Sequence, residues 1–300
     1  MSNNFFYVIN CIMIIVPEFL QIHKADRKLL KKMNETELQE EVLCEIESGF
    51  HSIFVVKNKV GVFIKYLDTY QAGFIKSPYY SGNLPYINYF LIPYLMNKNI
   101  KDILIIGFGS GIVIKQYLSL FDNLKRIDIV DIEENIFDIA KKYFNFKQTD
   151  KMNFYLQDGI VFLKSIKKKY DLIVVDVANN TGIDSRFYSG DYLALIKSHL
   201  KKTGIFVSNL ASSRDIFNKK NKLTLDLINL YRTFFSNIDI YSGEASNRVF
   251  YKTFFDIDDN ILDITNLILI SSNKNYRIKK DDKIGSIVDI EPYLNDLLRL

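Results

Sequence analysis

Residues 101–111 read KDILIIGFGSG, in which a run of branched apolar residues leads directly into three glycines at alternate positions. The run at 103–106 has the length and composition of a buried strand. Glycine has no Cβ atom, so Gly107, Gly109 and Gly111 permit a tight turn and let backbone N–H groups approach a ligand closely. A strand, a glycine turn and a following helix together predict a ligand site at the edge of an α/β sheet. The alternative is a turn that only packs the helix against the strand.

Downstream of the glycines, short apolar runs alternate with segments of helical periodicity. The strands expected there are RIDIVDI (126–132), NFYLQ (153–157), DLIVVD (171–176) and GIFVSNL (204–210). This alternation is typical of βαβ units, which build a parallel sheet with helices on both faces. NIDIYSG and NRVFYKTFF (237–243 and 247–255) read as two further strands. The late strand pair fits a methyltransferase-type sheet, in which the last strand inserts antiparallel, so we expect an α/β fold with a methyltransferase-like, doubly wound, mostly parallel sheet.

The chain before the glycines has a different character. HSIFVV and VGVFIKYL (51–56 and 60–67) are rich in β-branched and aromatic residues, and Lys57, Asn58 and Lys59 separate them like a hairpin turn. A small N-terminal β domain is therefore expected before the sheet. The C-terminal stretches ILDITNLILIS and PYLNDLLRL read as helical. The boundaries we expect are an N-terminal extension at 1–41, the small β domain at 42–80, a Rossmann-like domain at 81–255 and a C-terminal helical segment at 256–300.

Composition and charge argue against several classes of protein. The 300 residues are 48% apolar, which suits a globular protein. The net charge of +4, from 39 basic and 35 acidic residues, does not indicate a nucleic-acid partner. The two cysteines form no CxxC pair, so neither a disulfide framework nor a zinc site is expected, and a reducing cytoplasm is the expected location. The three histidines have no ligand spacing, and we expect no metal.

The apolar stretch FFYVINCIMIIV at 5–16 needs separate consideration. It is about 12 residues long, whereas a membrane helix needs roughly 20. No basic residue precedes it, so a signal peptide also fits poorly. We interpret it as a packing strand or helix and expect no membrane partner, with a short membrane-associated segment as the alternative.

Acidic residues after the next two strands extend the glycine site. Asp131 lies about twenty residues beyond the last glycine, where a carboxylate accepts hydrogen bonds from the two hydroxyls of a ribose. Asp158 and Gly159 follow the third strand, where a carboxylate can hold an adenine amino group while the backbone contacts the ring. The alternative is that Asp131, Asp158 or Glu133 only caps a helix. Together these residues, with Ile132 among the expected contacts, predict an adenosine pocket.

The glycine pattern also distinguishes between adenosine-containing ligands. It reads GxGxG, and Ile112 stands where a dinucleotide-binding turn has its third glycine. No second mononucleotide-binding half is evident in the sequence. The pattern therefore favours an adenosyl sulfonium, such as S-adenosylmethionine, over NAD.

Several stretches, taken in order, resemble one family. They are HSIFVVKNKVGVFIKYLDTYQAG, SGNLPYINYFLIPYL, ILIIGFGSG, IDIVDIEENIFDIAKKYF, LQDGIVFL, YDLIVVDVANNTG and LKKTGIFVSNL. The chain resembles the spermidine synthase family, the polyamine aminopropyltransferases, and is still more similar to its divergent members. The resemblance covers residues 42–255 and includes a small β domain that a plain methyltransferase would lack. It implies transfer of an aminopropyl group from decarboxylated S-adenosylmethionine to putrescine or a similar amine, without a metal.

The resemblance also implies roles for individual residues. Gln71 matches a glutamine near the donor, and Tyr86 approximately matches a tyrosine that lines the amine site. Asp176 matches the first acid of a DxxD loop, which orients or deprotonates the attacking amine. The glycine turn with Ser110, the ribose acid Asp131 and the adenine site at Asp158 complete the implied donor site.

This chain departs from the family pattern at four positions. Ser110 stands where an aspartate grips the free amine of the donor, and the other departures are Asn179 for the second acid of DxxD, Asn180 for a proline and Asn88 for a glutamate. Removing a diammonium substrate from water is costly without paired carboxylates, so these changes weaken capture of a diamine. Asp184 or Asp191 could replace the lost charge, and each is equally well explained as a cap of a loop or helix.

Three functions therefore remain open. The first is aminopropyl transfer. The second is methyl transfer from ordinary S-adenosylmethionine, whose own carboxylate suits the backbone N–H groups and Ser110. The third is a catalytically inactive nucleoside-binding homologue. The expected partner is a small-molecule amine and not nucleic acid, and the resemblance implies a homodimer or homotetramer.

Overall fold

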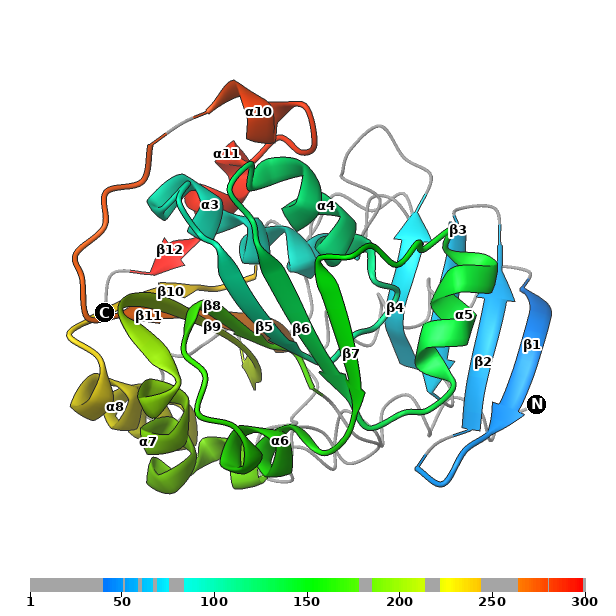
Figure 1. Ribbon diagram of the computed structural model, residues 1–300, viewed down its shortest axis with the longest axis horizontal. Helices are drawn as coiled ribbons and strands as arrows, with labels where there is room; N and C mark the ends of the chain where they lie inside the picture. Colours follow the sequence, from blue (N-terminus) through cyan, green and yellow to red (C-terminus); the bar gives the residue numbers. More distant parts are fainter. Residues whose placement is uncertain are drawn as a thin grey trace, which may run out of the picture.

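The computed structural model describes residues 40–50, 52–58, 61–66, 69–75, 84–177, 185–213, 222–243, 264–279 and 281–298. Within these ranges the chain forms a four-stranded sheet and an eight-stranded sheet that lie side by side (Figure 1). None of the helices in these ranges is long and apolar enough to cross a membrane. The apolar stretch at 5–16 and the strand expected at 247–255 lie outside the described residues.

The smaller sheet is antiparallel throughout. Its strands, in spatial order, are β1 (Glu41–Glu47), β2 (Ser52–Lys57), β3 (Gly61–Tyr66) and β4 (Thr69–Ile75). Asn58 N donates to the carbonyl of Gly61 at 3.0 Å, and Gly61 N donates to Asn58 Oδ1 at 3.1 Å. These bonds close the predicted hairpin between β2 and β3. The β structure expected before the glycine turn is present.

The larger sheet has five parallel strands. They are β5 (Asp102–Ile106), β6 (Arg126–Asp131), β7 (Met152–Leu156), β8 (Tyr170–Val175) and β9 (Leu200–Ser213). The spatial order is β12-β10-β11-β9-β8-β5-β6-β7. The chain moves outward from β5 to β6 and β7, then returns to β8 on the other side of β5. The order therefore reverses beside β5, and open α/β sheets bind ligands at such a reversal.

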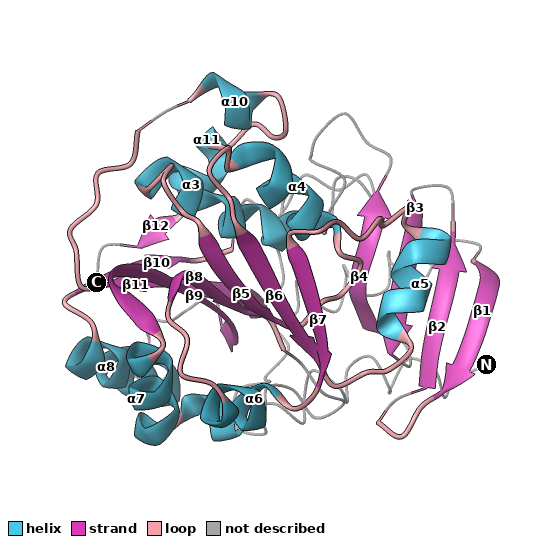
Figure 2. Cartoon of the chain, viewed as in Figure 1, coloured by secondary structure: helices cyan, strands magenta, loops and turns pink. Residues whose placement is uncertain are grey.

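Helices cover both faces of this sheet, as the doubly wound prediction requires (Figure 2). One side carries η1 (Pro85–Leu91), α3 (Ile92–Met96), α4 (Ile112–Leu120) and the short α10 (Asp282–Gly285) and α11 (Glu291–Leu294). The other carries α6 (Gly159–Ser165), η2 (Ser185–Tyr188), α7 (Gly190–Ser198) and α8 (Lys222–Phe234). Helix α5 (Ile136–Tyr143) lies beside the smaller sheet (Figure 1). The α/β, methyltransferase-like fold class is confirmed.

The C-terminal part of the chain corrects one prediction. The expected helix at ILDITNLILIS is wrong, because residues 264–272 form β11 (Ile264–Ser272), which pairs antiparallel with both β9 and β10 (Asn237–Tyr241). Leu267 and Leu269 pack into one hydrophobic core while Ile268 and Ile270 pack into the other. A strand buried on both faces is apolar at every position, so its periodicity does not distinguish it from a buried helix.

The stretch PYLNDLLRL is only partly helical. It contributes the end of α11, followed by the two-residue strand β12 (Leu297–Leu298), which pairs with β10. The segment expected to be helical at 256–300 therefore supplies two strands to the larger sheet, as far as it is described.

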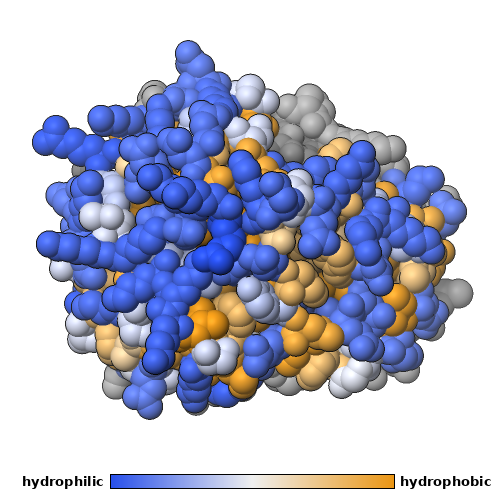
Figure 3. All heavy atoms as spheres, viewed as in Figure 1, coloured by the Kyte–Doolittle hydropathy of each residue, from blue (hydrophilic) through white to orange (hydrophobic). Residues whose placement is uncertain are grey.

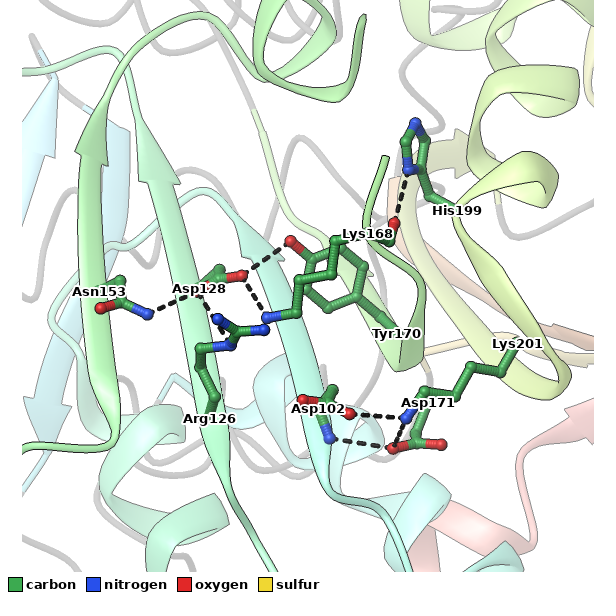
Figure 4. Close-up of polar contacts among 9 residues, drawn as sticks. All are labelled: Asp102, Arg126, Asp128, Asn153, Lys168, Tyr170, Asp171, His199 and Lys201. Carbon is green, nitrogen blue, oxygen red and sulfur yellow. Dashed lines mark hydrogen bonds and ion pairs between the residues drawn. The ribbon is translucent and has the colours of Figure 1, made fainter. Parts of the chain in front are cut away.

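A buried polar cluster joins strands at the amino edge of the larger sheet (Figure 4). Asp128 of β6 is 2% exposed. Its carboxylate accepts hydrogen bonds from Asn153 Nδ2 at 2.8 Å, Lys168 Nζ at 2.7 Å and Tyr170 Oη at 2.8 Å. A buried carboxylate requires such partners, and these tie β6 to β7 and to the start of β8. The cluster lies at the opposite end of the strands from the glycine turn.

Candidate active site

The glycine turn after β5 has a backbone that other residues rarely adopt. Gly107, Gly109 and Gly111 have φ values of +94°, +56° and +72°. A Cβ atom at Gly107 would lie 2.0 Å from the carbonyl oxygen of Asp176, and one at Gly111 would lie 2.5 Å from the Phe146 ring. The turn therefore needs glycine at these two positions both for its conformation and for its close contacts.

Asp131 ends β6 directly beside this turn. Its Oδ2 accepts a hydrogen bond from Phe108 N at 2.7 Å, and its Oδ1 accepts one from Glu133 N at 2.9 Å. Burial raises the pKa of Asp131, and the N–H groups of Glu133 and Phe108 act against that rise. Tyr66 of β3 lies near enough that burial, followed by the charge of Asp131, raises the pKa of its phenol. The expected ribose acid is thus held against the glycine turn by the N–H group of Phe108.

Asp158 caps helix α6, which was the alternative interpretation of this residue. Its Oδ1 accepts hydrogen bonds from Ile160 N and Val161 N, both at 2.9 Å. Its Oδ2 lies 3.1 Å from Arg186 Nη2. A Cβ atom at Gly159 would lie 2.4 Å from the side chain of Ile106, so α6 can approach β5 this closely only with glycine here.

Exposed apolar side chains flank these two acids. Ile132, Leu156 and Val161 are 40%, 55% and 49% exposed. Figure 3 shows apolar side chains gathered where β7 ends and α6 begins, on a face that is otherwise mostly hydrophilic. An apolar surface beside carboxylates suits a flat heteroaromatic ring that carries hydrogen-bonding groups at its edge.

On the other side of the turn, Asp176 follows β8 and contacts two side chains. Tyr86 Oη of η1 donates to Asp176 Oδ2 at 2.9 Å, and Asn209 Nδ2 of β9 donates to Asp176 Oδ1 at 2.8 Å. Burial raises the pKa of Asp176, whereas the hydrogen bonds from Asn209 and Tyr86 act against that rise. Tyr86 Oη also lies 3.4 Å from the backbone oxygen of Gln71 in β4. The structure thus brings together the three residues that the family resemblance assigned to the donor and the amine.

Asn209 was missed in the sequence analysis. It lies in the strand predicted at GIFVSNL, where Ile205 and Val207 of the same face are completely buried. A polar residue that continues an apolar row at the carboxyl end of a parallel strand is a signal for a site residue. The sequence analysis considered acidic residues after the strands, and Asn209 is an amide within a strand.

The residues that depart from the family pattern, and the acids that could compensate for them, lie in different parts of the structure. Ser110 is 3% exposed within the glycine turn. Asn88 is completely buried, and its Nδ2 donates to Tyr293 Oη of α11 at 2.8 Å. Asp191 is exposed in the first turn of α7. Residues 179, 180 and 184 lie outside the described part of the chain.

The site therefore has two halves, one on each side of the glycine turn. Asp131 and Asp158 lie towards β6 and β7, and Asp176 with Tyr86 lies towards β8 and the smaller sheet. Across the ranges that the structure describes, no group of three or more His, Cys, Asp or Glu side chains is arranged to hold a metal ion. A carboxylate held by two donors is suited to receive a proton from a nucleophile.

Comparison with known proteins identifies the family. Residues 90–244, more than half of the chain, match the spermine/spermidine synthase domain. The chain belongs to the spermine/spermidine synthase family. A relative named polyamine aminopropyltransferase, from Buchnera aphidicola subsp. Acyrthosiphon pisum, is 28% identical over 232 residues, which cover 72% of this chain and 77% of the relative. A second protein of that name, from Alkaliphilus metalliredigens, is 31% identical over 121 residues, which cover 39% of this chain and 42% of the relative.

Solved structures of this family share the fold. The spermidine synthase from Thermotoga maritima superposes with a TM-score of 0.62 at 15% identity, covering 86% of this chain and 84% of that chain. A spermidine synthase in complex with the transition state analogue AdoDATO superposes with a TM-score of 0.63 at 15% identity, covering 86% of this chain and 85% of that chain. The predicted resemblance to the spermidine synthase family is confirmed.

Proposed function

We propose that this spermine/spermidine synthase family member is an aminopropyltransferase. It would move the aminopropyl group of decarboxylated S-adenosylmethionine to an amine such as putrescine. The observation that carries this proposal is the carboxylate of Asp176, held by Tyr86 and Asn209 beside the glycine turn. The names of the relatives, and the complex of a family member with AdoDATO, support the same reaction.

The reaction is an in-line displacement at the carbon that adjoins the sulfonium. The lone pair of the acceptor amine forms a new N–C bond while the C–S bond breaks, and both electrons of that bond stay on sulfur. Methylthioadenosine leaves as a neutral thioether, and the extra proton on the amine passes to Asp176. Because the electrophile is already activated, the protein mainly positions the two reactants and accepts this proton.

In this proposal the donor lies over the glycine turn. Asp131 would accept from the ribose hydroxyls, since its Oδ2 already contacts the turn through Phe108 N and a carboxylate has about four acceptor sites. Asp158 would receive the adenine amino group, and Ile132 would contact the ring with its exposed side chain. Gln71 would lie beside the aminopropyl group.

Ser110 favours a second candidate, methyl transfer from ordinary S-adenosylmethionine. A hydroxyl within the glycine turn can donate to a carboxylate, and the ordinary cofactor carries one where the decarboxylated donor does not. Aminopropyl transfer is the better supported of the two, because the hydrogen-bonded pair of Tyr86 and Asp176, on the side of the smaller sheet, would suit an amine.

Turnover with both donors tests the proposal. The purified protein is incubated with decarboxylated S-adenosylmethionine and a panel of amines that includes putrescine, and methylthioadenosine and the alkylated amine are measured by mass spectrometry. We expect both products in equal amounts, and at least a hundredfold less of them with Asp176→Asn, which loses the proton acceptor. Release of S-adenosylhomocysteine from ordinary S-adenosylmethionine, with no methylthioadenosine from either donor, would contradict aminopropyl transfer.

A further inference from the structure

Three polar side chains lie in a row on one face of the larger sheet. Asp176 follows β8, Asn209 lies in β9 and Asn266 lies in β11, and these elements are neighbours in the order β11-β9-β8. Val207 and Ile268, two positions away from the asparagines in their strands, pack into the same core. Since side chains two apart in a strand share a face, the three polar groups continue apolar rows at one edge of the sheet.

Hydrogen bonds link the row in a fixed order. Asn266 Nδ2 donates to Asn209 Oδ1 at 3.0 Å, and Asn209 Nδ2 donates to Asp176 Oδ1 at 2.8 Å. Tyr86 Oη occupies the other oxygen of the carboxylate. Each of these bonds donates towards Asp176, and Asn266 lies on a strand that the proposed reaction does not use.

The order matters because an amide can face a neighbour with either its oxygen or its NH₂ group. The NH₂ group of Asn209 stabilises a carboxylate, whereas its oxygen would repel one. A donor from Asn266 requires the oxygen of Asn209 to face β11, so the NH₂ group must face Asp176. We propose that Asn266 is a positioning residue, which orients the Asn209 amide and thereby keeps Asp176 ionised and aimed at the acceptor amine.

The surroundings of Asp176 agree with this role. Among the described residues, the titratable side chain that contacts Asp176 is Tyr86 of η1, while β9 offers the neutral amide of Asn209 and the glycine turn offers backbone. Burial, followed by the charge of Asp176, raises the pKa of Tyr86 well above its usual value, so the phenol stays protonated and donates. Ionisation of Asp176 therefore depends on two donors that oppose its burial.

The inference rests on the proposed function, but its test does not require turnover. Titration of Asp176 is followed by carboxyl carbon NMR, with the signal assigned through Asp176→Asn. Asn266→Leu keeps the size of the side chain and removes its donor. We expect the pKa of Asp176 to rise by about half a unit to one unit. If the enzyme transfers aminopropyl groups, the acidic limb of kcat/KM moves upward by the same amount, and the KM for the donor stays unchanged.

A double-mutant cycle separates positioning from general damage to the strand. Asn209→Leu alone should raise the pKa of Asp176 at least as much as Asn266→Leu does. Adding Asn266→Leu to Asn209→Leu should cause no further rise, because Asn266 acts through Asn209. Ser271→Ala, a buried change further along β11, serves as the matched control and should leave the titration unchanged.

The outcomes distinguish the two proposals. An unchanged Asp176 titration in folded Asn266→Leu protein overturns the positioning role, whatever the activity. A rise that persists equally in the Asn209→Leu background also overturns it. Absence of aminopropyl turnover in the unaltered protein, with the expected NMR shift intact, rejects the proposed reaction and leaves the orienting role of Asn266 standing.

Discussion

Gly107 lies between the proposed donor half and the proposed amine half of the site. An added Cβ atom would lie 2.0 Å from the carbonyl oxygen of Asp176, on a backbone with φ of +94°. Gly107→Ala should therefore lower the free energy of unfolding by about 3 kcal/mol and displace Asp176. Chemical denaturation measures the first effect. Gly285→Ala is the matched control, since a Cβ atom there meets no atom within 4 Å. Equal stability of the two variants would contradict the strained turn.

Arg186 pairs with the carboxylate oxygen of Asp158 that the helix cap leaves available. The side chains of Arg186 and Asp158 are 55% and 19% exposed, so the pair contributes at most about 1 kcal/mol. Arg186→Gln should strengthen methylthioadenosine binding by up to about fivefold, because the adenine amino group no longer competes with the guanidinium. Isothermal titration calorimetry measures this. Weaker binding would mean that Arg186 contacts the nucleoside itself.

The sequence predicted the positions of the acidic residues at the candidate site better than those of the amide residues. Asp131 ends a strand, Asp158 and Asp176 follow strands, and the carboxyl ends of parallel strands meet at one edge. Their partners were not predictable in the same way. The bonds from Asn209 and Asn266 depend on the neighbours of β9, and sheet order is a long-range property that local spacing does not encode.

Strand β11 shows where hydrophobic periodicity fails to distinguish a strand from a helix. Its residues alternate between two hydrophobic cores, so every position from 267 to 270 is apolar. Three isoleucines in ITNLILISS favoured a strand, but that signal is weak beside a continuous apolar run. The parallel strands were predicted correctly because glycines, acids and helical segments separate them.

The Asp128 cluster ties β6 to the start of β8, far from the proposed reaction (Figure 4). Asp128→Asn removes the charge and leaves Lys168, whose side chain is 22% exposed, without its partner. We expect the free energy of unfolding to fall by about 2 kcal/mol, less than for a fully buried pair. Urea denaturation measures this, and nucleoside affinity should stay within about twofold. A large loss of affinity at unchanged stability would contradict a structural role.

A second charged group joins the amino ends of β5, β8 and β9. Lys201 Nζ lies 2.6 Å from Asp102 and 2.8 Å from Asp171. Burial acts to raise the pKa of Asp102, but the hydrogen bond and charge of Lys201 outweigh it and hold that pKa below 3.8. The lowered pKa stabilises the fold above the unfolded value, and this contribution is lost as pH falls through the folded value. Asp102→Asn should therefore flatten the acid side of the stability curve below about pH 4. An equally steep acid limb in the variant would contradict this assignment.

In the whole molecule, the two sheets contribute to one site. Ala72 of β4 would lie 3.2 Å from a Cβ atom at Gly109, and Tyr66 of β3 lies near Asp131. Tyr86 donates to Asp176, and its hydroxyl lies 3.4 Å from the backbone oxygen of Gln71 in β4. The family resemblance assigned Gln71 to the donor and Tyr86 to the amine site, whereas residue spacing alone gave no way to place β4 against the glycine turn.

The most direct test of the account is a crystal structure with methylthioadenosine bound. We expect the ribose hydroxyls on the Asp131 carboxylate, the adenine amino group at Asp158 and the sulfur atom on the Asp176 side of the glycine turn. A nucleoside bound elsewhere, or a turn that stays empty at saturating ligand, would contradict the assignment of the site.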